Sequence, residues 1–441
     1  MAAYQFRAVE EAVFSLKNQR AALLIMKSAN KPLLLYIGSE NSNQKGAIGT
    51  HTAGIVNGLS ASGYFQKSFF VGGRPNMELN IPLETEDIFF VDIDVAAAHS
   101  IAGRMYRRYL LLRKISIRVK FLLCKHVDFK MIIYTRYSLF STFILLVMLH
   151  TPLKSSGAML VTEYNDISID QLIFTNNFRR SFFARFLRTN PLVLWFLKRT
   201  EAYIFSFSDL TVVMTDKIMD YVLRISKNAR TLVLPNATSS ALITRAKASD
   251  KYETRKELGL PMDYFYLAHI GTLTYWDGLE YLLRGMERCE NIKNIKLLII
   301  GDGDALPMIR NQVHIDHLEK NIRFFPPMPH DKAFKYLIAS DVVPILKTID
   351  TYQLCPIKYY EALGAGKPLI CTDIQYINGI ADKKFGRVVK CPPPAEEIMD
   401  AIEYFFSRKS VLDSWKNEIL TFALENHTWE QRVSVLLNTI K

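Results

Sequence analysis

Short apolar segments that end at a glycine or a polar turn alternate with helical segments along nearly the whole chain. Lys31–Gly38 is a segment of this kind, and Tyr264–Ile270 and Ile295–Ile300 repeat the pattern in the second half. Such runs, bounded by turn residues, are typical of strands buried on both faces. Strands that alternate with helices imply parallel sheets with right-handed crossovers. The sequence therefore predicts an α/β protein with two doubly wound domains that face each other across a cleft.

The individual elements follow from the same pattern. In the first half the expected strands are Lys31–Gly38, Lys67–Val71, Ile88–Val91, Met131–Tyr134, Ala158–Thr162, Thr211–Thr215 and Thr231–Leu234. In the second half they are Tyr264–Ile270, Ile295–Ile300, Ile322–Phe325, Asp341–Leu346, Lys367–Thr372 and Gly386–Val389. Helices are expected at Thr52–Ser62, Asp331–Ala339 and Pro356–Gly364, among others. We expect an N-terminal domain over residues 1–240 with an extra helix over about 1–30, a C-terminal domain over 241–424, and a final helix over 425–441 that crosses back to the N-terminal domain.

Composition excludes several classes of protein. The chain has 441 residues and is 49% hydrophobic, which excludes a mostly disordered chain. Its five cysteines are widely spaced without a CxxC pair, so we expect a reducing cytosol rather than a disulfide framework. The first 30 residues do not read as an export signal, because Glu10 and Glu11 interrupt them early. The longest uncharged run, Tyr137–Leu153, has 17 residues, fewer than the roughly 20 that span a bilayer, and we expect it in the core.

Positive charge is concentrated in the N-terminal half. Residues 101–200 hold 17 basic and 4 acidic residues, and two stretches, Arg104–Lys125 and Phe178–Arg199, carry eight and six basic residues without an acidic one. Both mix Arg and Lys with large apolar side chains, the composition of an interfacial helix at an anionic membrane. An ordinary solvated helix face is an alternative. Nucleic acid is a weaker one, because no nucleic-acid-binding motif accompanies the charge.

The segment Gln353–Thr372 (QLCPIKYYEALGAGKPLICT) is the most informative about a ligand. Pro356 suits the first turn of a helix, which leaves the backbone amides of Ile357 and Lys358 free at the helix start. Such a terminus attracts phosphate through unpaired N–H groups and the helix dipole, and Lys358 adds a full charge. Glu361, one turn further on, can accept hydrogen bonds from a ribose diol. A helix with a surface lysine and a capping glutamate is the alternative reading.

Several motifs in the second half occur together in one order. They are HIGTLTYWDGLEYLL (His269–Leu283), LLIIGDGD (Leu297–Asp304), IASDVVPIL (Ile338–Leu346), PIKYYEALGAGKPLI (Pro356–Ile370) and HTWEQRV (His427–Val433). In this order the chain resembles the GT-B glycosyltransferases of the family 4 (group 1) type, most clearly over about residues 264–435. The first half matches more loosely, through VTEYND at Val161–Asp166 and LVLPNAT at Leu232–Thr238, among others.

The resemblance implies two Rossmann-like domains and a retaining, metal-independent transferase that uses a nucleotide-sugar donor and no cofactor. The donor would lie mainly on the C-terminal domain, with Gly271, Thr272, Gly301, Asp302, Ile357, Lys358 and Glu361 as donor-binding residues. Glu361 falls on the second glutamate of the family's E-x7-E motif, whereas Gln353 occupies the position of the first. Thr272 and Asp277 replace the arginine and lysine that relatives place near the diphosphate, and Asn165 replaces a histidine near the donor sugar.

The chemistry expected at such a site is mainly positioning and electrostatics. Negative charge grows on the departing diphosphate, and donors at the helix start would stabilise it. We count Gln353, Glu361 and Asn165 as candidate catalytic residues. Gly46 and Gly49 would let the first N-terminal loop approach the diphosphate or the acceptor.

No metal site is expected from the acidic and histidine pairs. Asp92 and Asp94, and Asp302 and Asp304, form DxD triplets that are common by chance, and the i,i+3 spacing of His314 and His317 fits a solvated helix.

The sequence thus predicts a transferase that moves a sugar to a glycan or lipid-linked acceptor in cell-surface polysaccharide synthesis. We expect it in the cytoplasm, peripheral on the inner face of an anionic membrane. An inactive GT-B scaffold that recruits a partner enzyme at the membrane is the alternative. A nucleic-acid binder is a third and is not favoured.

Overall fold

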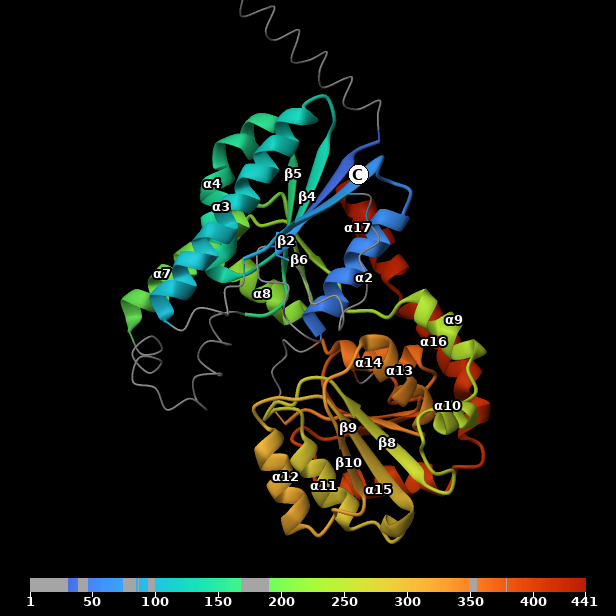
Figure 1. Cartoon of the computed structure of the whole chain (residues 1–441). Helices are drawn as coiled ribbons and strands as arrows, with labels where there is room; N and C mark the ends of the chain where they lie inside the picture. Colours follow the sequence, from blue (N-terminus) through green and yellow to red (C-terminus); the bar gives the residue numbers. More distant parts are fainter. Residues whose placement is uncertain are drawn as a thin grey trace, which may run out of the picture.

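The computed structural model describes residues 31–38, 47–73, 85, 87–93, 100–167, 190–348, 355–377 and 379–441. The expected helix over residues 1–30 lies outside this set. The described residues form two α/β lobes, one above the other in Figure 1, with the N-terminal lobe in blue and green and the C-terminal lobe in yellow and orange.

A seven-stranded parallel sheet forms the centre of the N-terminal lobe. Its strands are β1 (Leu33–Gly38), β2 (Lys67–Gly73), β3 (Asp87–Val91), β4 (Met131–Arg136), β5 (Met159–Tyr164), β6 (Leu210–Val213) and β7 (Thr231–Val233), in the order β3-β2-β1-β4-β5-β6-β7. Leu33 is in register with Lys67 of β2 and with Met131 of β4. Each strand falls on an apolar run that predicted it, so the expectation of a doubly wound sheet is confirmed for this lobe.

Helices cover both faces of this sheet. They are α2 (Ala47–Ala61), α3 (Ile101–Lys125), α4 (Leu139–Ser156), α7 (Pro191–Phe207) and α8 (Asp216–Ile225). Along β1, Leu33 and Leu35 pack with Leu112 of α3, whereas Leu34 packs in the opposite cluster with Val56 of α2. Side chains of a strand point alternately to its two faces, so β1 must be apolar throughout to be covered on both. Figure 1 shows α3, α4 and α7 side by side on one face of the sheet.

Local sequence signals set the helix ends. Ser100 begins α3, and its side-chain oxygen accepts a hydrogen bond from the amide of Gly103 at 2.9 Å. Asn190 and Pro191 begin α7 as a capping side chain followed by proline. Gly157 ends α4 with a φ of 64°, a conformation that glycine adopts without strain.

The uncharged run Tyr137–Leu153 lies mostly in α4. Its residues Leu145, Leu146 and Leu149 are buried, whereas Phe140 and Val147 are exposed. The expectation that the run lies in the core is therefore confirmed for one side of the helix only. In the part of the chain that the structure describes, no helix has the length and the apolar character needed to cross a bilayer.

The C-terminal lobe contains two three-stranded parallel sheets that continue one another. Their strands are β8 (Phe265–Ile270), β9 (Ile295–Ile300), β10 (Ile322–Phe325), β11 (Val343–Ile345), β12 (Leu369–Thr372) and β13 (Gly386–Val389), in the orders β10-β9-β8 and β11-β12-β13. A parallel bridge between Leu267 and Val342 joins β8 to the start of β11. The second expected doubly wound domain is therefore also present.

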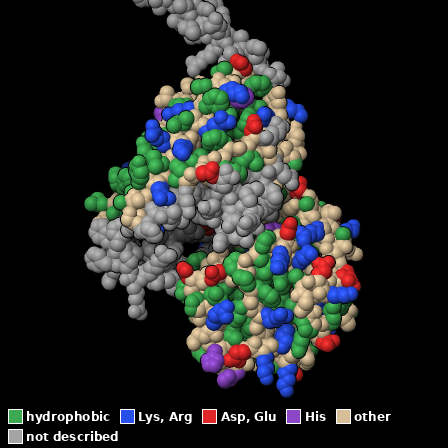
Figure 2. Space-filling view, viewed as in Figure 1, with side chains coloured by type: hydrophobic (Ala, Val, Ile, Leu, Met, Phe, Trp, Pro, Cys, Tyr) green, Lys and Arg blue, Asp and Glu red, His purple; other side chains and the backbone are tan. Residues whose placement is uncertain are grey.

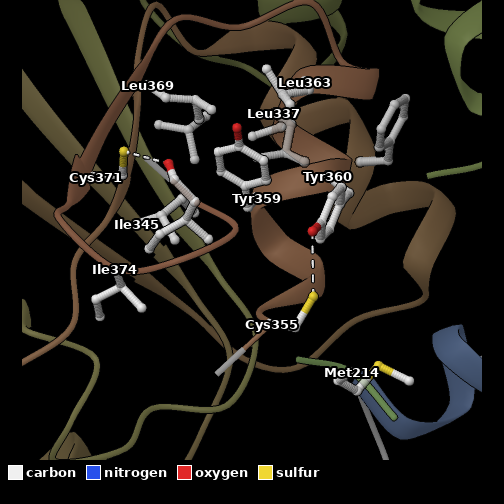
Figure 3. Close-up of a cluster of buried hydrophobic side chains, with 14 of the residues drawn as sticks. Met214, Leu337, Ile345, Cys355, Tyr359, Tyr360, Leu363, Leu369, Cys371 and Ile374 are labelled. Atoms are coloured by element: carbon white, nitrogen blue, oxygen red, sulfur yellow. Dashed lines mark hydrogen bonds between the residues drawn. The ribbon is translucent and has the colours of Figure 1, made fainter. Parts of the chain in front are cut away.

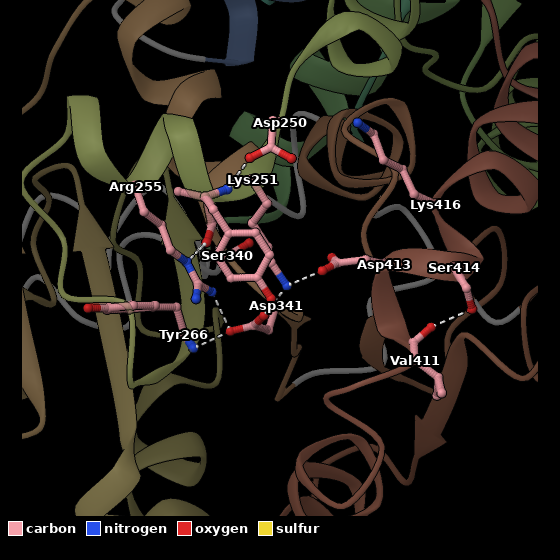
Figure 4. Close-up of polar contacts among 12 residues, drawn as sticks. Asp250, Lys251, Arg255, Tyr266, Ser340, Asp341, Val411, Asp413, Ser414 and Lys416 are labelled. Carbon is pink, nitrogen blue, oxygen red and sulfur yellow. Dashed lines mark hydrogen bonds and ion pairs between the residues drawn. The ribbon is translucent and has the colours of Figure 1, made fainter.

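The helices of this lobe are α9 (Ser240–Ala248), α10 (Lys251–Glu257), α11 (Leu279–Glu287), α12 (Leu306–Ile315), α13 (His330–Ala339), α14 (Ile357–Gly364), α15 (Ala395–Phe406) and α16 (Lys416–Asn426), with short 3-10 turns at Ile292–Asn294 and Leu412–Trp415. A buried charged cluster ties α10 to the sheet (Figure 4). Asp341 contacts Lys251 at 2.9 Å and Arg255 at 2.6 Å, and it accepts the amide of Tyr266. All of Asp341's partners are within the lobe, so the cluster fixes the lobe's own packing.

The last helix, α17 (Trp429–Ile440), packs on the N-terminal lobe. Trp429 and Val433 belong to the apolar cluster that includes Val56 of α2, and a side chain at Gly54 would collide with the Trp429 ring. Thr428 caps the helix and forms a parallel bridge with Thr238, at the crossing between the lobes. The end of the chain is thus part of the N-terminal core.

Candidate functional site

Two glycines bring the ends of β8 and β9 into close contact. Gly271 and Gly301 have φ values of 117° and 142°, which side-chain-bearing residues rarely adopt. A side chain on Gly301 would collide with the carbonyl oxygen of Gly271. Asp302 stabilises the same turn, since its carboxylate accepts the amide of Gly303 at 2.7 Å. Both strand ends therefore expose backbone at the edge where ligands bind to parallel sheets.

Lys358, in the first turn of α14, reaches back to the end of β8. Its Nζ lies 3.2 Å from Nε2 of His269, 3.3 Å from the carbonyl oxygen of Thr272 and 3.3 Å from Oδ1 of Asp277. Its Cε lies over Gly271, where a side chain would meet it. Burial lowers the pKa of Lys358, although Asp277 opposes this shift. The predicted donor-binding residues Gly271, Thr272 and Lys358 are thus brought together.

His269 is uncharged beside this lysine. Burial, together with the charge of Lys358, holds the pKa of His269 well below its usual range. Neutral imidazole can accept a hydrogen bond, so Nζ of Lys358 donates to Nε2 of His269.

Asp277 holds a second lysine beside the first. Its Oδ1 lies 2.5 Å from Nζ of Lys347, and its Oδ2 accepts hydrogen bonds from the amide and hydroxyl of Thr274 at 3.1 and 2.7 Å. Burial raises the pKa of Asp277, but Lys347 and Lys358 outweigh it and hold that pKa far below its ordinary value. The three side chains therefore carry a net charge of +1 at the end of β8.

Lys347 was not identified from the sequence. It follows β11 by two residues, so the rule that ligands bind beyond the carboxyl ends of parallel strands could have singled it out.

Glu361 lies one turn along α14 and pairs with a histidine from the preceding helix, α13. Nε2 of His330, the first residue of α13, lies 2.6 Å from Oε1 of Glu361, and the two side chains are 14% and 13% exposed. Burial lowers the pKa of His330, yet the charge of Glu361 outweighs it, and the pKa is raised. The contact leaves Oε2 of Glu361 as the oxygen that faces away from this partner. His330 was missed because it lies 31 residues from Glu361 in sequence.

The start of α14 differs slightly from the expectation. Pro356 is the capping residue just before the helix, with φ −69° and ψ 123°, and Ile357 is the first helical residue. The side chain of Ile357 is buried in the cluster that includes Val56 and Trp429 of the N-terminal lobe. The first amides of a helix have no partner within it. The helix start therefore lies at the boundary between the two lobes.

The remaining predicted residues are scattered or outside the described set. Asn165 follows β5 directly, and among the described residues its buried Oδ1 has no hydrogen-bond partner. Gly49 lies in the first turn of α2. Gln353, Gly46 and Asp94 fall outside the described residues.

Among the described residues, no group of three or more His, Cys, Asp or Glu side chains is arranged to hold a metal ion. His314 pairs instead with Glu319 at 2.9 Å. The five cysteines are free thiols.

Comparison with known proteins identifies the C-terminal lobe. The sequence model of the family "Glycosyl transferases group 1" matches residues 250–419. An uncharacterized glycosyltransferase of Methanocaldococcus jannaschii, MJ1607, is 22% identical over 196 residues, 44% of this chain and 48% of that protein. The putative teichuronic acid biosynthesis glycosyltransferase TuaC of Bacillus subtilis is 28% identical over 170 residues, 38% of this chain and 39% of that protein. The matched region thus spans less than half the length of these two relatives.

Solved structures match over nearly the whole chain. HepE of Anabaena in complex with UDP has a TM-score of 0.61 at 14% identity, covering 92% of this chain and 99% of that one. Sucrose-phosphate synthase of Thermosynechococcus elongatus has a TM-score of 0.66 at 16% identity, covering 93% and 98%. WaaG, a glycosyltransferase involved in lipopolysaccharide biosynthesis, has a TM-score of 0.63 at 14% identity, covering 92% and 99%. Residues 250–419 in the C-terminal lobe are therefore similar to the group 1 glycosyl transferases, and the chain as a whole has the GT-B fold of these solved structures.

Proposed function

We propose that this chain transfers a sugar, with retention of configuration, from a nucleotide-sugar donor to a glycan or lipid-linked acceptor in cell-surface polysaccharide synthesis. One observation carries the proposal: Lys358 and Lys347 converge on Asp277 at the end of β8, beside Gly271 and one turn from Glu361. The relatives named above support it, since TuaC is assigned to teichuronic acid synthesis, WaaG to lipopolysaccharide synthesis, and HepE was crystallised with UDP.

The charge cluster suits a nucleoside diphosphate. The amides of Ile357 and Lys358 and the ammonium of Lys358 would hold the diphosphate. Asp277 neutralises Lys347 and keeps Lys358 directed at the end of β8. This arrangement would take the place of the arginine and lysine that relatives carry at the positions of Thr272 and Asp277. Oε2 of Glu361 would accept a hydrogen bond from the ribose diol, while His330 holds the other carboxylate oxygen.

The reaction would need little from the protein beyond these contacts. The bond between the sugar's anomeric carbon and the diphosphate oxygen breaks, its electron pair stays on the diphosphate, and the sugar passes through an oxocarbenium-like centre. The acceptor hydroxyl attacks the same face, and its proton goes to the departing diphosphate. Lys358 and the helix amides stabilise the growing negative charge. Asn165 and Gln353 would hydrogen-bond hydroxyls of the donor sugar, and Gly46 and Gly49 would admit the diphosphate or acceptor to the N-terminal loop. No metal ion is required.

A surface of the N-terminal lobe supports a membrane-bound site of action. The basic–apolar face, as we call it, consists of exposed large apolar side chains on α3, α4 and α7: Met105, Tyr106, Tyr109, Ile117, Phe121, Phe140, Val147, Leu192, Trp195 and Phe196. Leu192 and Met105 are 77% and 69% exposed, and exposed basic residues such as Arg108 and Lys198 lie among them. Figure 2 shows hydrophobic and basic side chains interspersed over this part of the lobe.

An anionic membrane surface fits this face better than water alone. Apolar side chains would enter the headgroup boundary while arginines and lysines meet lipid phosphates. We therefore place the protein on the cytoplasmic face of the membrane, where a lipid-linked acceptor would reach the N-terminal lobe. The free thiols agree with a reducing compartment.

The replacements at Thr272 and Asp277 also favour the alternative of an inactive GT-B scaffold that recruits a partner enzyme. One experiment separates the two. The purified chain is incubated with a panel of UDP-, GDP- and ADP-sugars, with and without lipid-linked acceptors, and release of the nucleoside diphosphate is measured. Release from at least one donor supports a transferase. Absence of both release and binding of UDP, GDP and ADP contradicts it and favours the scaffold.

A further inference from the structure

A buried histidine in the N-terminal lobe links three segments that are distant in sequence. His51 lies in α2 and is 4% exposed. Its Nε2 lies 2.6 Å from Oε1 of Glu163 in β5, which is 1% exposed. Its Nδ1 lies 2.6 Å from Oδ1 of Asn236, which follows β7. The ring is thus held between two oxygen atoms.

Asn236 carries the chain of contacts into the C-terminal lobe. Its side-chain amide donates to the carbonyl oxygen of Cys355, and its backbone amide lies 3.1 Å from Sγ of the same residue. Sγ of Cys355 in turn lies 3.3 Å from the hydroxyl of Tyr360 in α14, and Figure 3 shows this contact. The donor atoms of the Asn236 amide face Cys355, so its oxygen must face His51.

Both ring nitrogens of His51 therefore lie close to oxygen atoms of other segments of the chain. Burial raises the pKa of Glu163, but His51 outweighs it and lowers that pKa to about 2. The second oxygen of Glu163 accepts the hydroxyl of Tyr134 at 2.5 Å. Buried ion pairs add little net stability compared with apolar side chains, so stability alone is a weak reason for this one.

Each segment in the chain of contacts carries candidate site residues. His51 follows Gly49 by two residues in the first turns of α2, Glu163 precedes Asn165 by two, and Cys355 stands directly before the capping residue of α14. We propose that His51 is a positioning residue, whose side chain ties these three segments together across the boundary between the lobes. We call the contacts that run from Glu163 through His51 and Asn236 to Cys355 the tether. The importance of the tether for donor binding rests on the proposed function, whereas the existence of the tether does not depend on it.

A second buried glutamate supplies a matched control. Glu201 is 0% exposed and accepts hydroxyl groups from Tyr137, Tyr164 and Tyr221 at 3.3, 2.7 and 2.6 Å. All four residues lie in the N-terminal lobe, so Glu201→Gln weakens a buried network there without touching the link to Cys355.

The test measures backbone hydrogen exchange of the full chain without ligand. His51→Gln and Asn236→Ala should each speed hydrogen exchange in residues 355–364 about tenfold, with exchange in α15 unchanged. In the wild type, the start of α14 can open only if these contacts break, whereas in the variants they are already lost and opening costs less free energy. The double variant should exchange no faster than either single variant, since both remove one link. Glu201→Gln should leave residues 355–364 unchanged. Unchanged exchange in both single variants, or equal acceleration by Glu201→Gln, overturns the proposal. Asn236→Ala decides the question if His51→Gln does not fold.

A binding measurement then asks whether the tether positions the site. His51→Gln should weaken binding of UDP, GDP or ADP, whichever the wild type binds, about five- to tenfold, and Glu201→Gln should not. Faster exchange with unchanged affinity would contradict a positioning role. If the wild type binds none of the three nucleotides, the proposed function fails, while the exchange experiment still decides the tether.

Discussion

Nε2 of His330 lies 2.6 Å from Oε1 of Glu361, with both side chains largely buried at the start of α13 and in α14. This contact directs one carboxylate oxygen to the histidine and leaves the other for a ligand. If that ligand is a ribose diol, the pair is what fixes its position.

Replacing Glu361 by glutamine should weaken nucleoside diphosphate binding about 10- to 100-fold, because a charged acceptor of ribose hydroxyls is lost. Isothermal titration with UDP, GDP and ADP measures this. Glu319→Gln, in an exposed pair with His314, is the control and should bind as the wild type does. Equal affinity of the Glu361 variant and the wild type would remove Glu361 from the donor site.

The His330–Glu361 pair should make stability depend on pH. The pKa of His330 is raised in the folded chain, so the pair's contribution is fully present below the unfolded pKa of about 6.5 and is lost as pH rises through the folded value. The Tm of the wild type should therefore exceed that of His330→Gln most at pH 6 and least at pH 9. Thermal unfolding of both proteins across this range tests it. A difference that grows with pH would contradict the pairing.

Replacing Asp277 by asparagine should destabilise the C-terminal lobe by about 3–5 kcal/mol, because Lys347 is left buried without its counter-charge. Chemical denaturation measures the loss. Asp382→Asn removes a surface contact with Lys383 and should leave the free energy of unfolding unchanged. Equal stability of the two variants would show that Lys347 is not held by Asp277.

Gly301→Ala should cost about 2–4 kcal/mol, since the new side chain meets the carbonyl of Gly271 and φ is 142°. Gly259 offers a control with φ 63° and open space around it, where alanine should cost about 1 kcal/mol. The two free energies of unfolding are compared by denaturant titration. Equal costs would mean that the strand ends are not as closely packed as described.

Membrane binding should depend on the basic–apolar face. Trp195→Ala with Arg108→Glu should reduce flotation with vesicles containing anionic lipid at least tenfold, since each basic residue contributes about 1 kcal/mol near such a surface. Lys256→Glu with Lys293→Glu, exposed in the C-terminal lobe, is the control. If both variants lose flotation, net charge alone explains the binding. If the wild type binds neutral vesicles as strongly as anionic ones, an anionic membrane is not its partner.

The sequence predicted the strands well because their apolar runs are local signals. The apolar core of β1 and the glycines after β8 and β9 can be recognised without any tertiary contact. The start of α14 was one residue off, because proline is acceptable both in the first turn and just before it. The basic stretch Arg104–Lys125 lies almost wholly in α3, whereas only the end of Phe178–Arg199 is described, as the first turns of α7.

The partners of the site residues could not be predicted. Lys347 is 70 residues from Asp277, and Cys355 is 119 residues from Asn236. A charge pair over such a separation leaves no periodic signal in a single sequence, and the fold alone brings its members together. Likewise, the sequence shows Asp277 only as the replacement of a lysine that relatives carry, whereas in the structure Asp277 orients Lys347 and Lys358.

We propose above that the donor's diphosphate binds at the start of α14. A crystal structure of the chain with a nucleoside diphosphate bound would show whether it does. We expect phosphate oxygens within about 3 Å of the amides of Ile357 and Lys358 and of Nζ of Lys358, with a ribose hydroxyl on Oε2 of Glu361. A nucleotide bound elsewhere, with Lys358 still against Asp277 and Glu361 free of ribose, would contradict it.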